Sequence, residues 1–329
     1  MVQQVRSQVL CLILSLSFFA ATLVSQRANA DVLFEGYSKI MLEQTHIGYV
    51  IQRNEFNPKT KEFSMVYYLR TQPPANDVIE SLKARADAGL KPLGYQYTEL
   101  AGGKVRIVDA AFKNDVMTIT VVENGQKKVM APKKVPKGAF LSSFLGYLML
   151  QGKEGIKVGV KYNYVAIAEE DGGIYDGEAF IKAEEAVSGV SAFKILNTFK
   201  KTSFSSHITA KGEIIDTLSP VQGISTKLVA NIQEATGGKS VNQNQLRQLF
   251  GSVPKGQDNV IARRSGGTPL GGAEAAKATS TPSTGAPTSK QKILEGEPST
   301  EAGKTEGVPG GKGIQIKGAP PAPSEKPEQ

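Results

Sequence analysis

Residues 158–187, "VGVKYNYVAIAEEDGGIYDGEAFIKAEEAV", contain the pattern that decides the fold class. Apolar side chains occupy every second position of the first half: Val158, Val160, Tyr162, Tyr164, Ala166 and Ala168. The same alternation returns at 179–187, after the turn sequence "EDGG" at 170–173, where Asp-Gly supplies the positive φ of a tight turn. A period of two on both sides of a turn predicts two antiparallel strands with one solvated face.

The same pattern extends through most of the chain. Turn sequences separate further alternating runs at 56–63, 101–104, 113–115, 123–126 and 210–213. We expect about ten strands, mostly joined by hairpins. The predicted fold class is mainly β with a few helices: a curved antiparallel meander, or open half-barrel, with helices on its concave face.

Two segments depart from alternation and are predicted to be helices. "PANDVIESLKARADAG" at 74–89 offers Asn76 as an N-cap and Gly89 as a stop. The run 139–150 is apolar on nearly all sides, which is typical of a buried helix, and the concave side of the sheet is its natural site. Two weaker helices are expected near 224–234 and 240–250.

The first thirty residues are predicted to be a signal peptide. The apolar run 9–24 is shorter than the roughly 20 residues of a spanning helix, and Ala28 and Ala30 match a signal-peptidase site before Asp31. Arg27, close to that site, keeps an uncleaved anchor open as the alternative. Cleavage implies the periplasm or cell envelope of a Gram-negative bacterium, with no transmembrane span in the mature chain.

The last part of the chain has a different composition. Phe250 is the last aromatic residue, and residues 251–329 are rich in Pro, Gly, Ser, Thr and Lys. Such a segment cannot bury enough apolar surface to offset the entropy of ordering its backbone. The predicted organisation is therefore a signal peptide at 1–30, a β half-barrel domain with terminal helices at 31–250 and a disordered tail at 251–329.

The layout resembles a known group of bacterial proteins. "YSKIMLEQTHIGYVIQ" at 37–52, the strands of 160–201 and "KGEIIDTLSP" at 211–220 are similar to β-domains of periplasmic proteins of unknown function, some attached to transglutaminase-like modules. Those domains look like relatives of the LolA/LolB-like lipoprotein carriers. The resemblance implies an open half-barrel whose helices cross an apolar concave face, and it carries over no functional residue.

The sequence lacks the catalytic and metal-ligating motifs of most enzyme classes. Cys11, the only cysteine, lies in the predicted signal peptide, so the mature chain has no disulfide and no thiol nucleophile. The two histidines, His46 and His207, lack zinc-site spacing, and no GxSxG motif occurs. The carboxylates of 169–171 and 184–185 are interpreted as solvated turn charge. We expect a non-enzyme without cofactor or metal; a hydrolase is the third alternative.

The charge balance also limits the partners. Loss of the two arginines in residues 1–30 lowers the formal net charge from +8 to +6, and no Lys/Arg block suggests a nucleic-acid arm. A lipid or another apolar ligand, or an envelope protein, remains as the expected partner.

Aromatic side chains on the predicted strands are the candidate ligand-lining residues. A tyrosine ring with a polar tip suits a groove that takes an amphipathic ligand. The candidates are Tyr67, Tyr95, Tyr97, Phe144, Tyr162 and Tyr164. Two functions follow: an exported protein that binds an apolar or amphipathic ligand in the concave face, or a structural or interaction module with a disordered tether and no small-molecule pocket. An open cavity on the concave side would favour the first, and a filled one the second.

Overall fold

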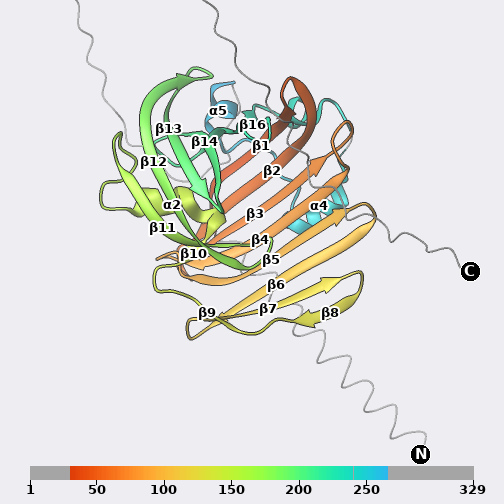
Figure 1. Ribbon diagram of the computed structural model, residues 1–329. Helices are drawn as coiled ribbons and strands as arrows, with labels where there is room; N and C mark the ends of the chain where they lie inside the picture. Colours follow the sequence, from red (N-terminus) through yellow and green to blue (C-terminus); the bar gives the residue numbers. More distant parts are fainter. Residues whose placement is uncertain (1–29, 240, 266–329) are drawn as a thin grey trace, which may run out of the picture. The chain divides into compact units, whose positions relative to one another are not determined.

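A computed structural model describes residues 30–239 and 241–265 of the chain (Figure 1). Sixteen strands form one sheet within these residues, with the following bounds: β1 (Asp31–Leu42), β2 (Thr45–Asn57), β3 (Glu62–Thr71), β4 (Val78–Asp87), β5 (Pro92–Ala101), β6 (Lys104–Lys113), β7 (Val116–Glu123), β8 (Gln126–Val129), β9 (Lys133–Lys134), β10 (Phe140–Leu141), β11 (Lys161–Ala168), β12 (Gly173–Val187), β13 (Val190–Phe199), β14 (Thr202–Ile208), β15 (Ile214–Ser219) and β16 (Ile224–Val229). The helices are η2 (Ser142–Phe144, one 3₁₀ turn), α2 (Leu145–Gln151), α3 (Ile232–Thr236), α4 (Gln243–Phe250) and α5 (Val260–Arg264).

The sheet is an antiparallel meander in which the first strand, β1, lies in the interior of the sheet, between β16 and β2. Its order is β10-β11-β12-β13-β14-β15-β16-β1-β2-β3-β4-β5-β6-β7-β8, with β9 paired to β7. β1 and β16 pair antiparallel, for example Ser38 with Leu228, so two runs of hairpins extend from a central seam. The sheet is curved and is not closed into a barrel (Figure 1). The prediction of a mainly β, curved and open antiparallel sheet is confirmed.

One apolar core lies inside the curve of the sheet. It joins side chains of β3–β7 to side chains of β11–β14, and α2 crosses between these two parts (Figure 1). Phe63 of β3 packs on Tyr147 of α2 with ring centroids 5.0 Å apart, and Phe140 meets Tyr164 of β11 edge to face at 5.6 Å. Burial of the apolar run 139–150 inside the curve is therefore confirmed, although β10 and η2 occupy 140–144 and the α-helix ends at Gln151.

A second core lies on the other face of β1–β3. Ile51 and Tyr68, which are paired across β2 and β3, point away from the side that carries Phe63 and Met65, because neighbouring strand residues alternate between faces. Helices α3 and α4 supply Ala235, Leu246 and Phe250 to this second core. The terminal helices α3 and α4 thus cover the face of β1–β3 opposite the concave core, because these strands are apolar on both faces.

Two predicted helices are strands. Residues 78–87 form β4 rather than a helix, with Leu82, Ala84 and Ala86 buried and Lys83 and Arg85 between them on the other face. Apolar positions 78, 79, 82 and 86 fit helical spacing as well, and pairing with β3 and β5 decides the outcome in favour of the strand. Residues 224–229 form β16, so the helix expected at 224–234 is reduced to α3.

The folded chain continues past residue 250. Glu35 is 2% exposed, and Arg53 Nε donates to its Oε2 at 2.6 Å. The backbone N–H of Gly256 donates to Glu35 Oε1 at 2.6 Å, and Asn259 Nδ2 donates to the Glu35 carbonyl at 3.0 Å. The chain past the predicted boundary at residue 250 is therefore part of the folded domain as far as the structure describes it, to Ser265. The remainder of the predicted tail and the signal peptide up to residue 29 lie outside the described residues.

No helix in the described part of the chain is long and apolar enough to cross a membrane.

Candidate functional site

Side chains fill the concave side of the sheet. Phe144 is 0% exposed, with its ring 6.4 Å from Phe63 and 6.3 Å from Tyr147. Tyr95 and Tyr97 of β5 are buried in the same core, and burial raises the pKa of both phenols. Four of the six predicted ligand-lining residues lie only in or against this core: Tyr67, Tyr95, Tyr97 and Phe144. Tyr164 is a buried member of it and Tyr162 packs against it as well.

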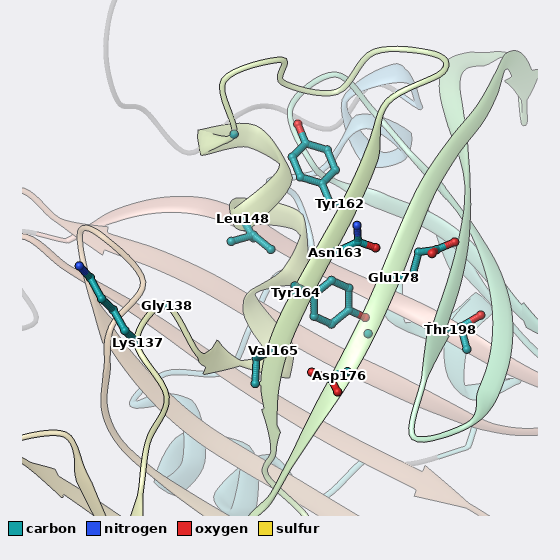
Figure 2. A pocket seen from close by; sticks show the side chains of 12 residues that line it. Lys137, Gly138, Leu148, Tyr162, Asn163, Tyr164, Val165, Asp176, Glu178 and Thr198 are labelled. Carbon is teal, nitrogen blue, oxygen red and sulfur yellow. The ribbon is translucent and has the colours of Figure 1, made fainter.

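The other two predicted residues, Tyr162 and Tyr164, line an open groove at the edge of the sheet. Its volume is about 720 Å³, and it lies between α2, β11 and the turn before β10 (Figure 2). The lining consists of Lys137, Gly138, Leu148, Gly152, Tyr162, Asn163, Tyr164, Val165, Asp176, Gly177, Glu178 and Thr198. We call this space the α2–β11 groove. In the sequence, the only indication of these two lining residues is that Tyr162 and Tyr164 are two positions apart, which places them on the same face of a strand.

One wall of the groove is an uncovered strand edge. β10 pairs in parallel with β11 only through Phe140 and Leu141, which face Ala166 and Ile167. Immediately before β10, Gly138 has φ 82°, a conformation that favours glycine, and the chain turns away from β11 there. Residues 161–164 of β11 consequently have no strand partner on this side among the residues that the structure describes, and Val165 bonds β10 only through its C=O.

The backbone groups on this edge can be assigned from the ladder. Ile181 N donates to the carbonyl of Val160 at 2.9 Å, in register with the β11–β12 pairing. In an antiparallel pair every second residue exchanges hydrogen bonds with the partner strand. The N–H and C=O groups of Lys161 and Asn163 therefore point away from β12 and into the groove. Val165 points the same way, but its C=O takes part in the parallel pairing with Phe140 of β10, so only its N–H is left for the groove.

The second wall is apolar and held in place. Tyr162 Oη donates to the carbonyl of Gly155 at 2.7 Å, and its ring covers Gly152, where an added Cβ would lie 2.5 Å from ring atom Cε1. Tyr164 Oη donates to Asn197 Oδ1 at 2.7 Å, and burial raises the pKa of this phenol. Leu148 of α2 completes the wall (Figure 2). Both hydroxyls already have acceptors. Because Tyr164 is buried, Tyr162 and Leu148 provide the partly exposed apolar surface of this wall.

Charged groups stand on the outer side of the edge. Glu178 pairs with Lys161 at 2.9 Å, while Asp176 is exposed and forms no ion pair within the described residues. Lys137 lies across the groove (Figure 2). The arrangement combines an apolar wall, a row of backbone donors and acceptors, and a rim that carries charges of both signs.

The carboxylates of 169–171 are structural. Glu169 is 4% exposed, and its two oxygens accept hydrogen bonds from Ser142 Oγ at 2.6 Å and Ser143 N at 3.1 Å. Burial raises the pKa of Glu169, against the opposing effect of these hydrogen bonds. Its interpretation as solvated turn charge is wrong, and the signal that could have shown this is its position directly after the buried run 166–168.

The neighbouring carboxylates form ion pairs rather than a reactive pair. Lys200 Nζ bridges Glu170 at 2.6 Å and Asp171 at 2.7 Å. Together with Glu169, these contacts hold the β11–β12 turn.

Neither histidine is arranged for acid–base or metal chemistry. His46 Nε2 lies 2.9 Å from the Gly48 carbonyl. His207 contacts Asp216 through Nδ1 at 2.6 Å and Glu185 through Nε2 at 2.8 Å, so both ring nitrogens are engaged. Partial burial lowers the His207 pKa, but the two carboxylates outweigh that effect and raise it. Among residues 30–239 and 241–265, no cluster of three or more His, Cys, Asp or Glu side chains could hold a metal ion.

Comparison with known proteins gives few matches. No protein-family model and no curated protein matches the chain. Among solved structures, it is similar to a β-barrel-like protein of domain of unknown function DUF1849 from Brucella abortus. That match has 11% identity and a TM-score of 0.40, and it covers 60% of this chain and 97% of the other. The resemblance to the LolA/LolB-like carriers stays a prediction.

Proposed function

We propose that the protein is an exported, non-enzymatic binding protein of the Gram-negative cell envelope, and that it holds an amphipathic ligand in the α2–β11 groove. The observation that carries this proposal is the uncovered edge of β11 at 161–165, which faces the apolar wall of Leu148 and Tyr162. A ligand with one apolar and one hydrogen-bonding side satisfies both walls at once. The groove volume of about 720 Å³ falls within the usual range of ligand sites.

Export rests on the sequence "ANA" at 28–30, since a signal-peptidase site there would leave Asp31 as the first mature residue. Asp31 is also the first residue of β1, so cleavage at this point keeps the sheet complete. Mass spectrometry of protein purified from its native host should show an N-terminus at Asp31. Recovery of the chain from Met1 in membranes would replace this part of the proposal with an anchored protein.

The second candidate function is an interaction module whose partner is another envelope protein. The filled concave side favours it over a lipid carrier, because a lipid held inside the curve would need the space that Phe144 and Leu141 occupy. This candidate differs from the first in the ligand and shares the groove as its site.

An apolar fluorophore tests the groove as the site. The folded mature chain should take up N-phenylnaphthylamine, and Leu148→Gln and Tyr162→Ala should each weaken uptake at least tenfold, because both changes remove the apolar wall. Val129→Gln, at an exposed position of β8, is the matched control and should leave uptake unchanged. Absence of uptake by the wild type, or equal uptake by all three variants, would refute the groove as an amphipathic site.

A further inference from the structure

We propose that the ligand of the α2–β11 groove is an extended polypeptide segment that adds to the sheet as a strand along residues 161–165 of β11. This inference rests on the groove being the binding site. It names the ligand class: a segment of another protein with apolar residues at alternate positions and basic residues between them.

The backbone of β11 provides the recognition. Lys161 and Asn163 each direct one N–H and one C=O into the groove, as the β11–β12 ladder requires, and Val165 adds its N–H, since its C=O is paired with β10. At about 3.3 Å per residue, these five residues extend over roughly 17 Å. A peptide backbone repeats donors and acceptors at the same spacing, whereas a lipid chain does not. Strand addition of this kind is a common mode of peptide recognition.

The β11 edge lacks the protection that sheet edges usually carry. Exposed edges are blunted by lysines, prolines, bulges or short length. The opposite end of the sheet follows this rule, since β8 is the four-residue strand "QKKV", which is exposed throughout. The free part of β11 is "KYNYV", without proline, and its one lysine is paired with Glu178. The contrast between the β8 edge and the β11 edge indicates that the β11 edge remains open to pairing with another strand.

The walls of the groove select the side chains of the incoming strand. Side chains that point toward α2 meet Leu148 and the ring of Tyr162, so they are apolar. Side chains that point the other way meet the outer rim, which carries the Lys161–Glu178 pair and, on β12, Asp176 without an ion pair within the described residues. A basic side chain can pair with Asp176 there, while Lys137 lies across the groove. Lys137 and Gly138 form the far side of the groove, which favours a single segment over the edge strand of a second copy (Figure 2).

A blocked eight-residue peptide of alternating valine and lysine tests this inference on the mature full-length chain. Fluorescence anisotropy should detect binding, and hydrogen exchange should slow at the amides of Lys161, Asn163 and Val165 on addition of peptide. The matched control is the same peptide with alternate backbone nitrogens methylated, which keeps every side chain and removes the donors. It should bind at least tenfold more weakly, and a valine–glutamate peptide should do the same.

Protein variants complete the test. Asn163→Pro removes a donor that faces the groove, at an edge position where proline is tolerated, and should weaken peptide binding at least tenfold. Asp176→Asn should weaken it two- to fivefold. If Asn163→Pro does not fold, the methylated peptide still decides the question.

Equal binding of the methylated and unmethylated peptides, or protection confined to β8, would overturn strand addition. Uptake of the fluorophore without any binding of the peptide would refute this inference and leave the proposed function standing. If neither binds, both are refuted.

Discussion

Replacing Phe144 with alanine tests whether the concave side is packed core or a lidded cavity. The Phe144 side chain is fully buried, between Phe63 of β3 and Tyr147 of α2. Phe→Ala changes at such positions lower the free energy of unfolding by roughly 3–5 kcal/mol, through lost burial and the cavity left behind. Strand side chains surround much of the site and can collapse only slightly, so we expect about 4 kcal/mol. In a domain of this size that is about 8–16 °C in Tm.

Urea unfolding followed by circular dichroism, with calorimetry for Tm, measures this loss. Phe144→Leu keeps most of the volume and should lower the free energy of unfolding by only about 1–2 kcal/mol. A loss below about 1 kcal/mol for Phe144→Ala would refute the packed core. Fluorophore uptake that Tyr97→Ala weakens more than Leu148→Gln would also refute it, because the ligand site would then lie inside the curve.

Three further predictions follow from buried polar contacts. Truncation after Phe250 removes the two backbone N–H donors to Glu35 Oε1, those of Lys255 and Gly256, and leaves the Arg53 contact to Oε2. It should lower the free energy of unfolding by about 1–3 kcal/mol in urea unfolding, whereas truncation after Ser265 should leave it unchanged. Glu169→Ala leaves two donors without an acceptor and should lower the same quantity by about 1–3 kcal/mol, with Glu169→Gln losing less because an amide oxygen still accepts; equal losses would contradict this account. The pKa of His207 is raised above 6.5, so its contribution to stability is complete below pH 6.5 and is lost as pH rises through the higher folded value. Thermal unfolding at a series of pH values should therefore show a smaller fall above pH 6.5 in His207→Gln than in the wild type, and identical profiles would contradict the ion pair.

Alternation of side chains predicted the sheet because a strand places every second residue on one face. It failed at β4, where the helix formers Ala84 and Ala86 and the spacing of Leu82 fit both periods. Only pairing with β3 and β5, which local pattern does not contain, decides for the strand. The end of the domain was missed for a related reason. Asn259 and Glu35 are 224 positions apart, and a rule based on the last aromatic residue cannot detect their contact.

The sequence analysis named two of the residues that line the α2–β11 groove, Tyr162 and Tyr164, and did not locate the groove itself. Six aromatic residues share strand parity or helical spacing, and nothing in their local sequence separates core from groove. The separation comes from tertiary structure: the β11–β12 turn packs on Tyr95 at Gly172, while the turn at Gly138 leaves Tyr162 beside an open edge.

The central claim is that the ligand binds at the edge of β11 and not inside the curve of the sheet. Backbone chemical-shift mapping by nuclear magnetic resonance, on the mature chain titrated with the valine–lysine peptide, tests it most directly. The account predicts that the largest shift changes fall at Leu148 and Gly152 and along residues 161–165, with Leu82, Tyr95 and Tyr97 unchanged. Changes centred on Leu82, Tyr95 and Tyr97 would contradict it.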